Sequence, residues 1–121
     1  LPEAGLRIDA RLDTRAPGVN GAGDAAVQAG AVRLPLAVRN RRPGDRFRPL
    51  GAPGRRKLQD VFVDRKVPRM ERDRVPVVVD ADGQIVWVAG VTVAHDCRVT
   101  APEDGVLILI QREQPEQRTA Q

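Results

Sequence analysis

The densest concentration of charge in the sequence constrains the fold most, because these side chains must lie on a surface. Residues 39–74 hold thirteen lysine and arginine residues and five acidic ones, a net charge of +8, whereas the whole chain carries +4. Apolar residues recur within this basic segment, and proline and glycine interrupt it where turns would lie. The pattern predicts a folded, positively charged surface, which suits a polyanion such as nucleic acid.

Composition narrows the class of protein and the kind of partner. The 121 residues fit one domain, and aromatic residues make up only 2%. Because base stacking needs aromatic side chains, we expect recognition of phosphates and shape. The single cysteine, Cys97, excludes an internal disulfide and fits a reducing compartment, so we expect the cytoplasm. No apolar run approaches the roughly 20 residues that cross a bilayer, and we expect no membrane partner.

A catalytic interpretation would rest on His95 and Cys97, which lie two residues apart on a predicted strand. We interpret Cys97 instead as a half-buried structural thiol, because alternation alone places the two side chains on one face. One histidine, one cysteine and scattered acids do not make a metal ligand set. We therefore expect no catalytic residue, no metal site and no cofactor in this chain.

The apolar pattern predicts a chain that is mostly strand. Residues 15–30 are rich in glycine and predict a loop. Runs at period two or rich in β-branched residues predict strands at 5–14, 31–38, 75–79, 84–89, 90–94, 97–100 and 105–111. Pro35 marks the second of these as an edge or a bulge. A turn at 80–83 joins 75–79 and 84–89 as a hairpin.

The spacing of Leu58, Val61 and Phe62 predicts a helix that ends at Val67-Pro68. A second short helix is expected over 68–74, with Met70 as its inward residue. Pro43 and Gly44 predict a type II turn over 42–45. Phe62 and Trp87 are expected in the core. The predicted fold class is α+β, with a small β-sandwich-like core and one or two short helices.

The side chains predicted to contact nucleic acid bracket the turn at 42–45, precede the helix, or follow it. They are Arg39, Asn40, Arg41, Arg42, Arg46, Arg55, Arg56, Lys57, Lys66, Arg69, Arg72 and Arg74. Arginine can bind two phosphate oxygens at once, and a helix N-terminus favours phosphate. The alternative is a solvated face with local ion pairs to the interleaved acids, and a capping role for Asn40.

The order of motifs resembles the C-terminal domain of tRNA(Ile)-lysidine synthetase. The matching elements are RNRRPGDRF at 39–47, KLQD at 57–60, KVP at 66–68 and IVWVAG at 85–90. The resemblance is strongest over residues 34–100. It implies a tRNA-binding domain over 1–112 with a polar tail at 113–121, and a fold similar to a domain of the phenylalanyl-tRNA synthetase β chain.

The resemblance also implies a function. The family's enzyme is an ATP-dependent ligase that joins lysine to the wobble cytidine of tRNA(Ile) to form lysidine. Its N-terminal catalytic domain holds ATP with a Ser-Gly-Gly-x-Asp-Ser loop, which these residues lack. Because the chain starts at Leu1, we expect a non-catalytic fragment of that enzyme. Its implied partners are the acceptor-stem side of tRNA(Ile) and the N-terminal domain, with ATP and Mg²⁺ serving only the parent protein.

Two other functions remain open from the residues alone. The chain could be a tRNA-binding module of an aminoacyl-tRNA synthetase, which would share the fold. It could also be a protein-interaction or dimerisation module, with the apolar strands at 75–79 and 105–111 forming a homodimer interface. An independent enzyme is not favoured, because the sequence shows no nucleophile–base pair, phosphate loop or metal set.

Overall fold

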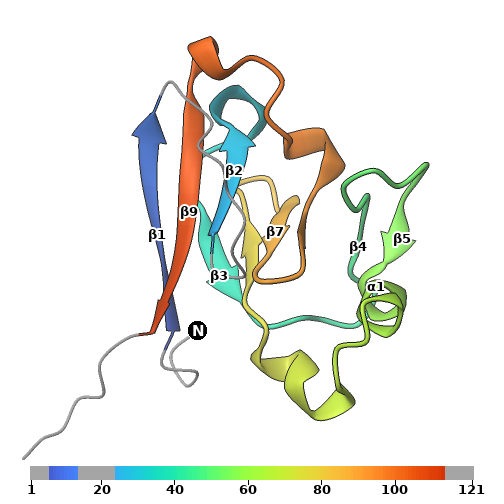
Figure 1. The fold of residues 1–121 in the computed structure, drawn as a ribbon. Helices are drawn as coiled ribbons and strands as arrows, with labels where there is room; N and C mark the ends of the chain where they lie inside the picture. Colours follow the sequence, from blue (N-terminus) through green and yellow to red (C-terminus); the bar gives the residue numbers. More distant parts are fainter. Residues whose placement is uncertain (1–5, 14–23, 114–121) are drawn as a thin grey trace, which may run out of the picture.

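The computed structural model describes residues 6–13 and 24–113, and these residues form two antiparallel sheets, a two-stranded hairpin and one α-helix (Figure 1). The two sheets lie side by side, and the helix and hairpin lie on the side away from the first sheet (Figure 1). One apolar core joins residues of both sheets and the helix. The α+β class predicted from the sequence is confirmed.

The first sheet is built around the last strand of the described chain. It has the order β1-β9-β2, where β1 is Leu6–Asp13, β9 is Val106–Glu113 and β2 is Asp24–Gln28. Residues 106–109 of β9 are all buried. A strand buried on both faces reads as a continuous apolar run, which is why this segment shows no alternation.

The second sheet has the order β3-β6-β7-β8 and contains most of the core. Its strands are β3 (Ala37–Arg39), β6 (Val77–Val79), β7 (Ile85–Val88) and β8 (Thr92–Val93). Every residue of β6 and β7 is buried, Trp87 included. The predicted hairpin and the core position of Trp87 are confirmed. Of the two apolar segments that the sequence offered as a homodimer interface, residues 76–79 and 105–109 are buried within the domain.

The basic segment forms the third part of the molecule. It comprises β4 (Arg46–Phe47), β5 (Arg56–Lys57), α1 (Leu58–Asp64) and the 3-10 helix η3 (Arg69–Arg74). As the spacing predicted, α1 buries Leu58, Val61 and Phe62 against the sheets. The exposed faces of these elements therefore carry the charge.

The helix α1 ends earlier than predicted. Its last residue is Asp64, and Lys66 then takes the left-handed conformation with φ of 58°. The N–H of Val67 donates to the carbonyl of Phe62 at 2.9 Å, and the N–H of Lys66 donates to that of Val63 at 3.1 Å. This pair of hydrogen bonds forms a Schellman motif, which satisfies the last carbonyl groups of the helix before Pro68.

Two predictions for the N-terminal third were wrong. Residues 24–28 of the predicted loop form β2, and the rest of that loop before residue 24 lies outside the described residues. The strand predicted over 31–38 is only β3, preceded by the short 3-10 helix η2 (Ala29–Ala31). The backbone of Arg33 cannot pair with a neighbouring strand. Its N–H donates to the Asp80 carboxylate, and its carbonyl accepts from the N–H of Ala81.

The strand predicted over 97–100 was also wrong. Only Cys97 of this segment lies in a regular element, the 3-10 helix η4 (His95–Cys97), and η5 (Pro102–Asp104) follows. The N–H groups of Cys97 and Arg98 donate locally, to the carbonyls of Ala94 and His95. The buried amide of Gln28 accepts hydrogen bonds from the N–H groups of Thr100 and Ala101 and donates to the carbonyls of Ala101 and Gly105. Local turns and the Gln28 side chain thus satisfy backbone groups that a strand ladder would otherwise have used.

The helix predicted over 68–74 is the 3-10 helix η3, and Met70 does not face the core. Its side chain is 83% exposed. Val67 and Val75, which flank η3, pack against the core instead. Glu113, which the sequence assigned to the polar tail, is the last residue of β9, and residues 114–121 lie outside the described residues.

A buried carboxylate fastens the loop before β3 to the β6–β7 turn. Asp80 accepts hydrogen bonds from the N–H groups of Arg33, Asp82 and Gln84 and from the Gln84 side chain, at 2.8–3.1 Å. Burial raises the pKa of Asp80, but these hydrogen bonds outweigh burial, so the pKa lies below its usual 3.8. The charged form of Asp80 therefore stabilises the fold.

We expect Asp80→Asn to lower the free energy of unfolding by about 2–3 kcal/mol, because an amide cannot accept from four donors. Since the folded pKa is depressed, the stabilisation by Asp80 is present above pH 3.8 and is lost as the pH falls through the folded pKa. Urea unfolding between pH 2 and 7 should show this loss in the wild type and a flatter profile in the variant. The control is Asp82→Asn in the same turn, whose side chain is exposed; equal losses in both would contradict the role of Asp80.

Candidate nucleic-acid interface

The turn at 42–45 places the first group of predicted contact residues. Gly44 has a φ of 85°, and the N–H of Asp45 donates to the carbonyl of Arg42 at 3.1 Å, as the predicted type II turn requires. The carbonyl of Asp45 then accepts the first helical N–H, from Leu58, at 2.9 Å. The β4–β5 pairing places Arg46 opposite Lys57. The turn and the start of α1 are therefore held together.

The side chain of Asp45 makes a half-buried ion pair with Arg39. Its two oxygens accept from the two Nη atoms of Arg39 at 2.9 and 3.0 Å, and one also accepts from the N–H of Arg42 at 2.8 Å. Only 10% of the Asp45 side chain and 17% of the Arg39 side chain are exposed. Burial raises the pKa of Asp45, but the bonds from Arg39 and Arg42 bring it below the usual value. Arg39 thus supports the turn.

A second ion pair joins the turn to η3 and lies open to solvent. Arg41 Nε donates to Asp73 Oδ1 at 2.7 Å, and 74% of the Asp73 side chain is exposed. Asn40 Nδ2 donates to the carbonyl of Asp73 at 3.0 Å. These contacts place η3 beside residues 40–41, although about thirty positions separate them in sequence. The two segments form neighbouring walls of a groove.

Between these walls lies a groove of about 350 Å³. Its lining residues are Arg41, Arg42, Pro43, Gly44, Asp45, Lys57, Leu58, Gln59 and Asp73. Three of the predicted contact residues, Arg41, Arg42 and Lys57, line it together. Sequence reasoning missed Gln59 and treated Asp73 only as a rival partner for cations. The KLQD motif, which exposes a polar side chain in the first turn of the helix, was the available signal for Gln59.

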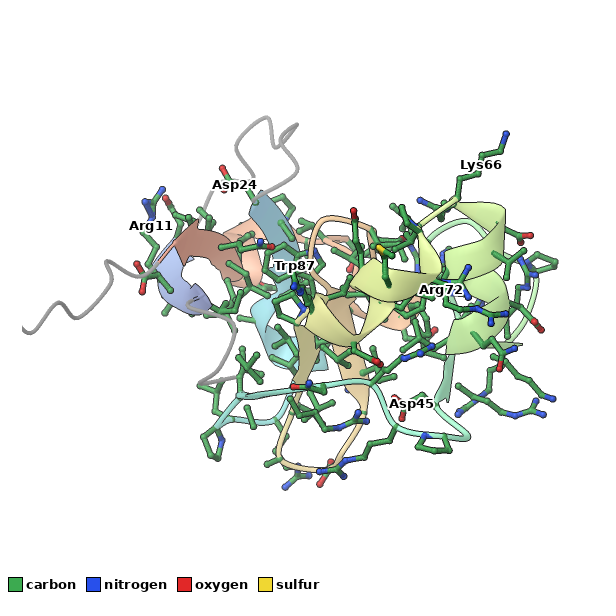
Figure 2. All side chains as sticks on the ribbon, turned by 90° about the horizontal axis from the view of Figure 1, so that it is seen from below. Arg11, Asp24, Asp45, Lys66, Arg72 and Trp87 are labelled. Carbon is green, nitrogen blue, oxygen red and sulfur yellow. The ribbon has the colours of Figure 1, made fainter. Side chains whose placement is uncertain are left out.

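The other predicted residues do not line the groove, and two of them, Lys66 and Arg72, lie on the same half of the molecule as Asp45 (Figure 2). Figure 2 shows Asp45, Lys66 and Arg72 at one side and Arg11 and Asp24 at the other. Arg56 pairs with Asp64, Arg55 donates to the carbonyl of Arg46, and Arg72 donates to that of Val67. Among the described residues, several predicted cations donate no side-chain hydrogen bond: Arg42, Arg46, Lys57, Lys66, Arg69 and Arg74. Their donors are available to a ligand.

The residues near His95 serve the fold. His95 Nδ1 accepts from the N–H of Gly51 at 3.1 Å, which ties the loop after β4 to η4. Burial and the nearby Arg48 and Arg98 lower the pKa of His95, which favours the neutral ring that this bond needs. Cys97 is fully buried rather than half-buried, and burial raises the pKa of its thiol to about 11. A neutral buried thiol is a poor nucleophile.

Within residues 6–13 and 24–113, no group of three or more histidine, cysteine, aspartate or glutamate residues is placed to hold a metal ion. No helix in that part of the chain is long and apolar enough to cross a membrane.

Residues 36–110 match the family model described as the TilS substrate C-terminal domain. The tRNA(Ile)-lysidine synthase of Geobacillus kaustophilus is 55% identical over 64 residues, which cover 53% of this chain and 14% of that protein. The synthase of Bacillus subtilis is 40% identical over 86 residues, which cover 71% of this chain and 18% of that protein. The chain thus spans less than a fifth of the length of these relatives.

Two solved structures are similar to this chain, one over nearly all of it and one over about three quarters. A crystal structure of a TilS C-terminal domain superposes with a TM-score of 0.78 at 36% identity, covering 96% of this chain and 89% of that one. An N-terminal fragment of the phenylalanyl-tRNA synthetase β subunit from Pyrococcus horikoshii superposes with a TM-score of 0.63 at 16% identity, covering 73% and 27%. The second likeness shows a shared fold, as the sequence predicted.

The two ion pairs of the turn should differ in their contribution to stability. We expect Arg39→Lys to lower the free energy of unfolding by about 1–3 kcal/mol, because an ammonium group cannot bridge both oxygens of a half-buried carboxylate. The matched variant Arg41→Lys changes an exposed pair and should cost less than about 1 kcal/mol. Urea unfolding at neutral pH measures both. Equal costs would mean that the Arg39–Asp45 pair is not the structural one.

Proposed function

Because the chain belongs to the family of TilS substrate C-terminal domains, we propose that it docks tRNA(Ile) by its acceptor stem for a tRNA(Ile)-lysidine synthase. In this proposal the parent protein is an ATP-dependent ligase that joins lysine to the wobble cytidine. Its chemistry resides in a catalytic domain N-terminal to this one, which is also where ATP and Mg²⁺ would bind. This chain contributes binding and no catalytic residue, and it works in the cytoplasm.

The observation that carries the proposal is the groove, which three cations line together. Arg41 and Arg42 at the turn and Lys57 on β5 line it, and four further predicted cations, Arg46, Lys66, Arg69 and Arg74, have unused donors. A helix of RNA has a wide, shallow minor groove that presents phosphates and 2′-hydroxyls, and proteins recognise it by shape and backbone contacts. Guanidinium groups suit phosphates, since their planar fork can bind two oxygens.

The burial of the aromatic side chains supports docking to a duplex and not to unpaired bases. Trp87, Phe47 and Phe62 are all buried, so among the described residues no aromatic ring is offered for stacking. The polar side chains beside the cations, Asn40 and Gln59, can bond sugar hydroxyls or base edges. In this proposal Arg39, bound to Asp45, holds the turn in place while its neighbours contact the RNA.

The double substitution Arg41→Glu/Arg42→Glu tests the proposal. We expect it to weaken binding of an isoleucine tRNA transcript at least about tenfold, because each hydrogen bond to a charged group contributes roughly 1.5–3 kcal/mol. A salt series should also show a slope reduced by roughly 1.4–1.8, equivalent to two fewer neutralised phosphates. The matched control is Arg33→Glu/Arg98→Glu, which changes net charge equally outside the groove and should bind nearly as the wild type does.

Two RNA fragments test which end of the tRNA is bound. An acceptor-stem minihelix should bind the wild-type chain about as tightly as the transcript does, and an anticodon stem-loop should bind much more weakly. Fluorescence anisotropy at two salt concentrations suffices. Equal binding of the two fragments would contradict acceptor-stem docking. Equal weakening by the two double variants would mean a diffuse charge effect without a defined site.

A further inference from the structure

We propose that the groove is a binding site for one phosphate group, and that the Asp73 carboxylate occupies part of this site until a phosphate displaces it from Arg41. The phosphate site rests on the geometry of the groove. That the phosphate belongs to an RNA backbone rests on the function proposed above.

The first observation is the position of the acid. Asp73 Oδ1 lies 2.7 Å from Arg41 Nε, and Asp73 lines the groove with Arg42 and Lys57. Carboxylate and phosphate oxygens are equivalent acceptors for a guanidinium group. An anionic oxygen therefore already lies where a ligand phosphate would meet the cations. Arg41 uses only its Nε in this contact, which leaves its two Nη atoms for further bonds.

The second observation is that Asp73 is weakly held, whereas the other acid of the groove is not. The Asp73 side chain is 74% exposed and accepts one hydrogen bond, and an exposed pair contributes less than about 1 kcal/mol. Asp45 accepts three bonds and is nearly buried. A phosphate that contacts Arg41, Arg42 and Lys57 together gains more than the single contact it replaces. The exchange therefore removes Asp73 and leaves Asp45 in place.

The third observation is that the backbone around Asp73 is fastened independently of its carboxylate. Asn40 holds the carbonyl of Asp73, and Arg72 Nε donates to the carbonyl of Val67 at 3.0 Å. The N–H of Glu71 donates to the carbonyl of Pro68 at 2.8 Å. Rotation of one exposed side chain is then enough to open the site, and both walls of the groove stay where they are.

Asp73 would set a threshold that an anion must exceed to occupy the site. A ligand that reaches only Arg41 competes with a carboxylate already in contact and gains little. A ligand that places a phosphate against all three cations overcomes that competition. The competitor lowers the affinity of every ligand that must displace it by the same factor, so only a ligand with several contacts still binds well.

The test compares Asp73→Asn with Asp82→Asn, which adds the same charge. Asp82 is exposed and pairs with Arg33 at 3.1 Å, outside the groove. We expect Asp73→Asn to bind pyrophosphate and the acceptor-stem minihelix up to about fivefold more tightly than the wild type, from removal of a competitor contributing under about 1 kcal/mol. Asp82→Asn should bind nearly as the wild type does. In the wild type, added pyrophosphate should shift the NMR signal of Arg41 Nε–H.

Each outcome decides the inference. Equal affinities of the two variants, or no pyrophosphate binding by either, would overturn it. Weaker binding by Asp73→Asn would also overturn it, since Asp73 would then orient Arg41 in the complex. If pyrophosphate binds as expected but RNA does not, the phosphate site stands and the docking function fails. If RNA binds but the variants are equal, docking stands and displacement fails. Urea unfolding of both variants checks that the exposed substitutions leave the fold intact.

Discussion

The basic surface depends on one residue, Asp45, that binds three segments at once. Its carboxylate holds Arg39 at the end of β3 and the backbone of Arg42 in the turn, and its carbonyl starts α1 at Leu58. Cations repel one another, so a dense group of them keeps a defined shape only where an internal anion and backbone bonds fix it. The acid therefore makes the neighbouring cations usable as a structured site.

The acidic residues of the basic segment have unequal surroundings, and this difference explains how they act. Asp45 is shielded and receives several donors, so breaking its contacts leaves a poorly solvated charge. Asp64 and Asp73 lie open to water, where their pairs with Arg56 and Arg41 are weak and exchangeable. The net charge of the segment, +8, does not distinguish the shielded acid from the exposed ones. Burial decides which ion pairs are structural and which can yield to a ligand.

The sequence predicted the parts of the fold that follow from local pattern. The i, i+3, i+4 spacing of Leu58, Val61 and Phe62, the Pro43-Gly44 turn and the apolar hairpin strands all form as expected. The missed elements depend on distant partners: β2 is a strand because β9 pairs with it, and Gln28 binds the backbone N–H of Thr100 at the end of the predicted strand 97–100. Likewise, the sequence predicted Arg41, Arg42 and Lys57 as contact residues, but only the tertiary structure shows that they line one groove with Asp73 and Gln59.

The pairing of β9 with both β1 and β2 has a consequence for biosynthesis. Leu6 lies opposite Glu113, and Asp24 lies opposite Ile110, so neither early strand has its partner until residues 106–113 have left the ribosome. The second sheet and α1 involve only residues 37–93. They can assemble before β1 and β2 have a strand to pair with. Contacts of such long sequence separation form slowly, and strand edges that are still unpaired can associate with other chains. The time needed to translate residues 29–113 thus sets how long those edges stay exposed.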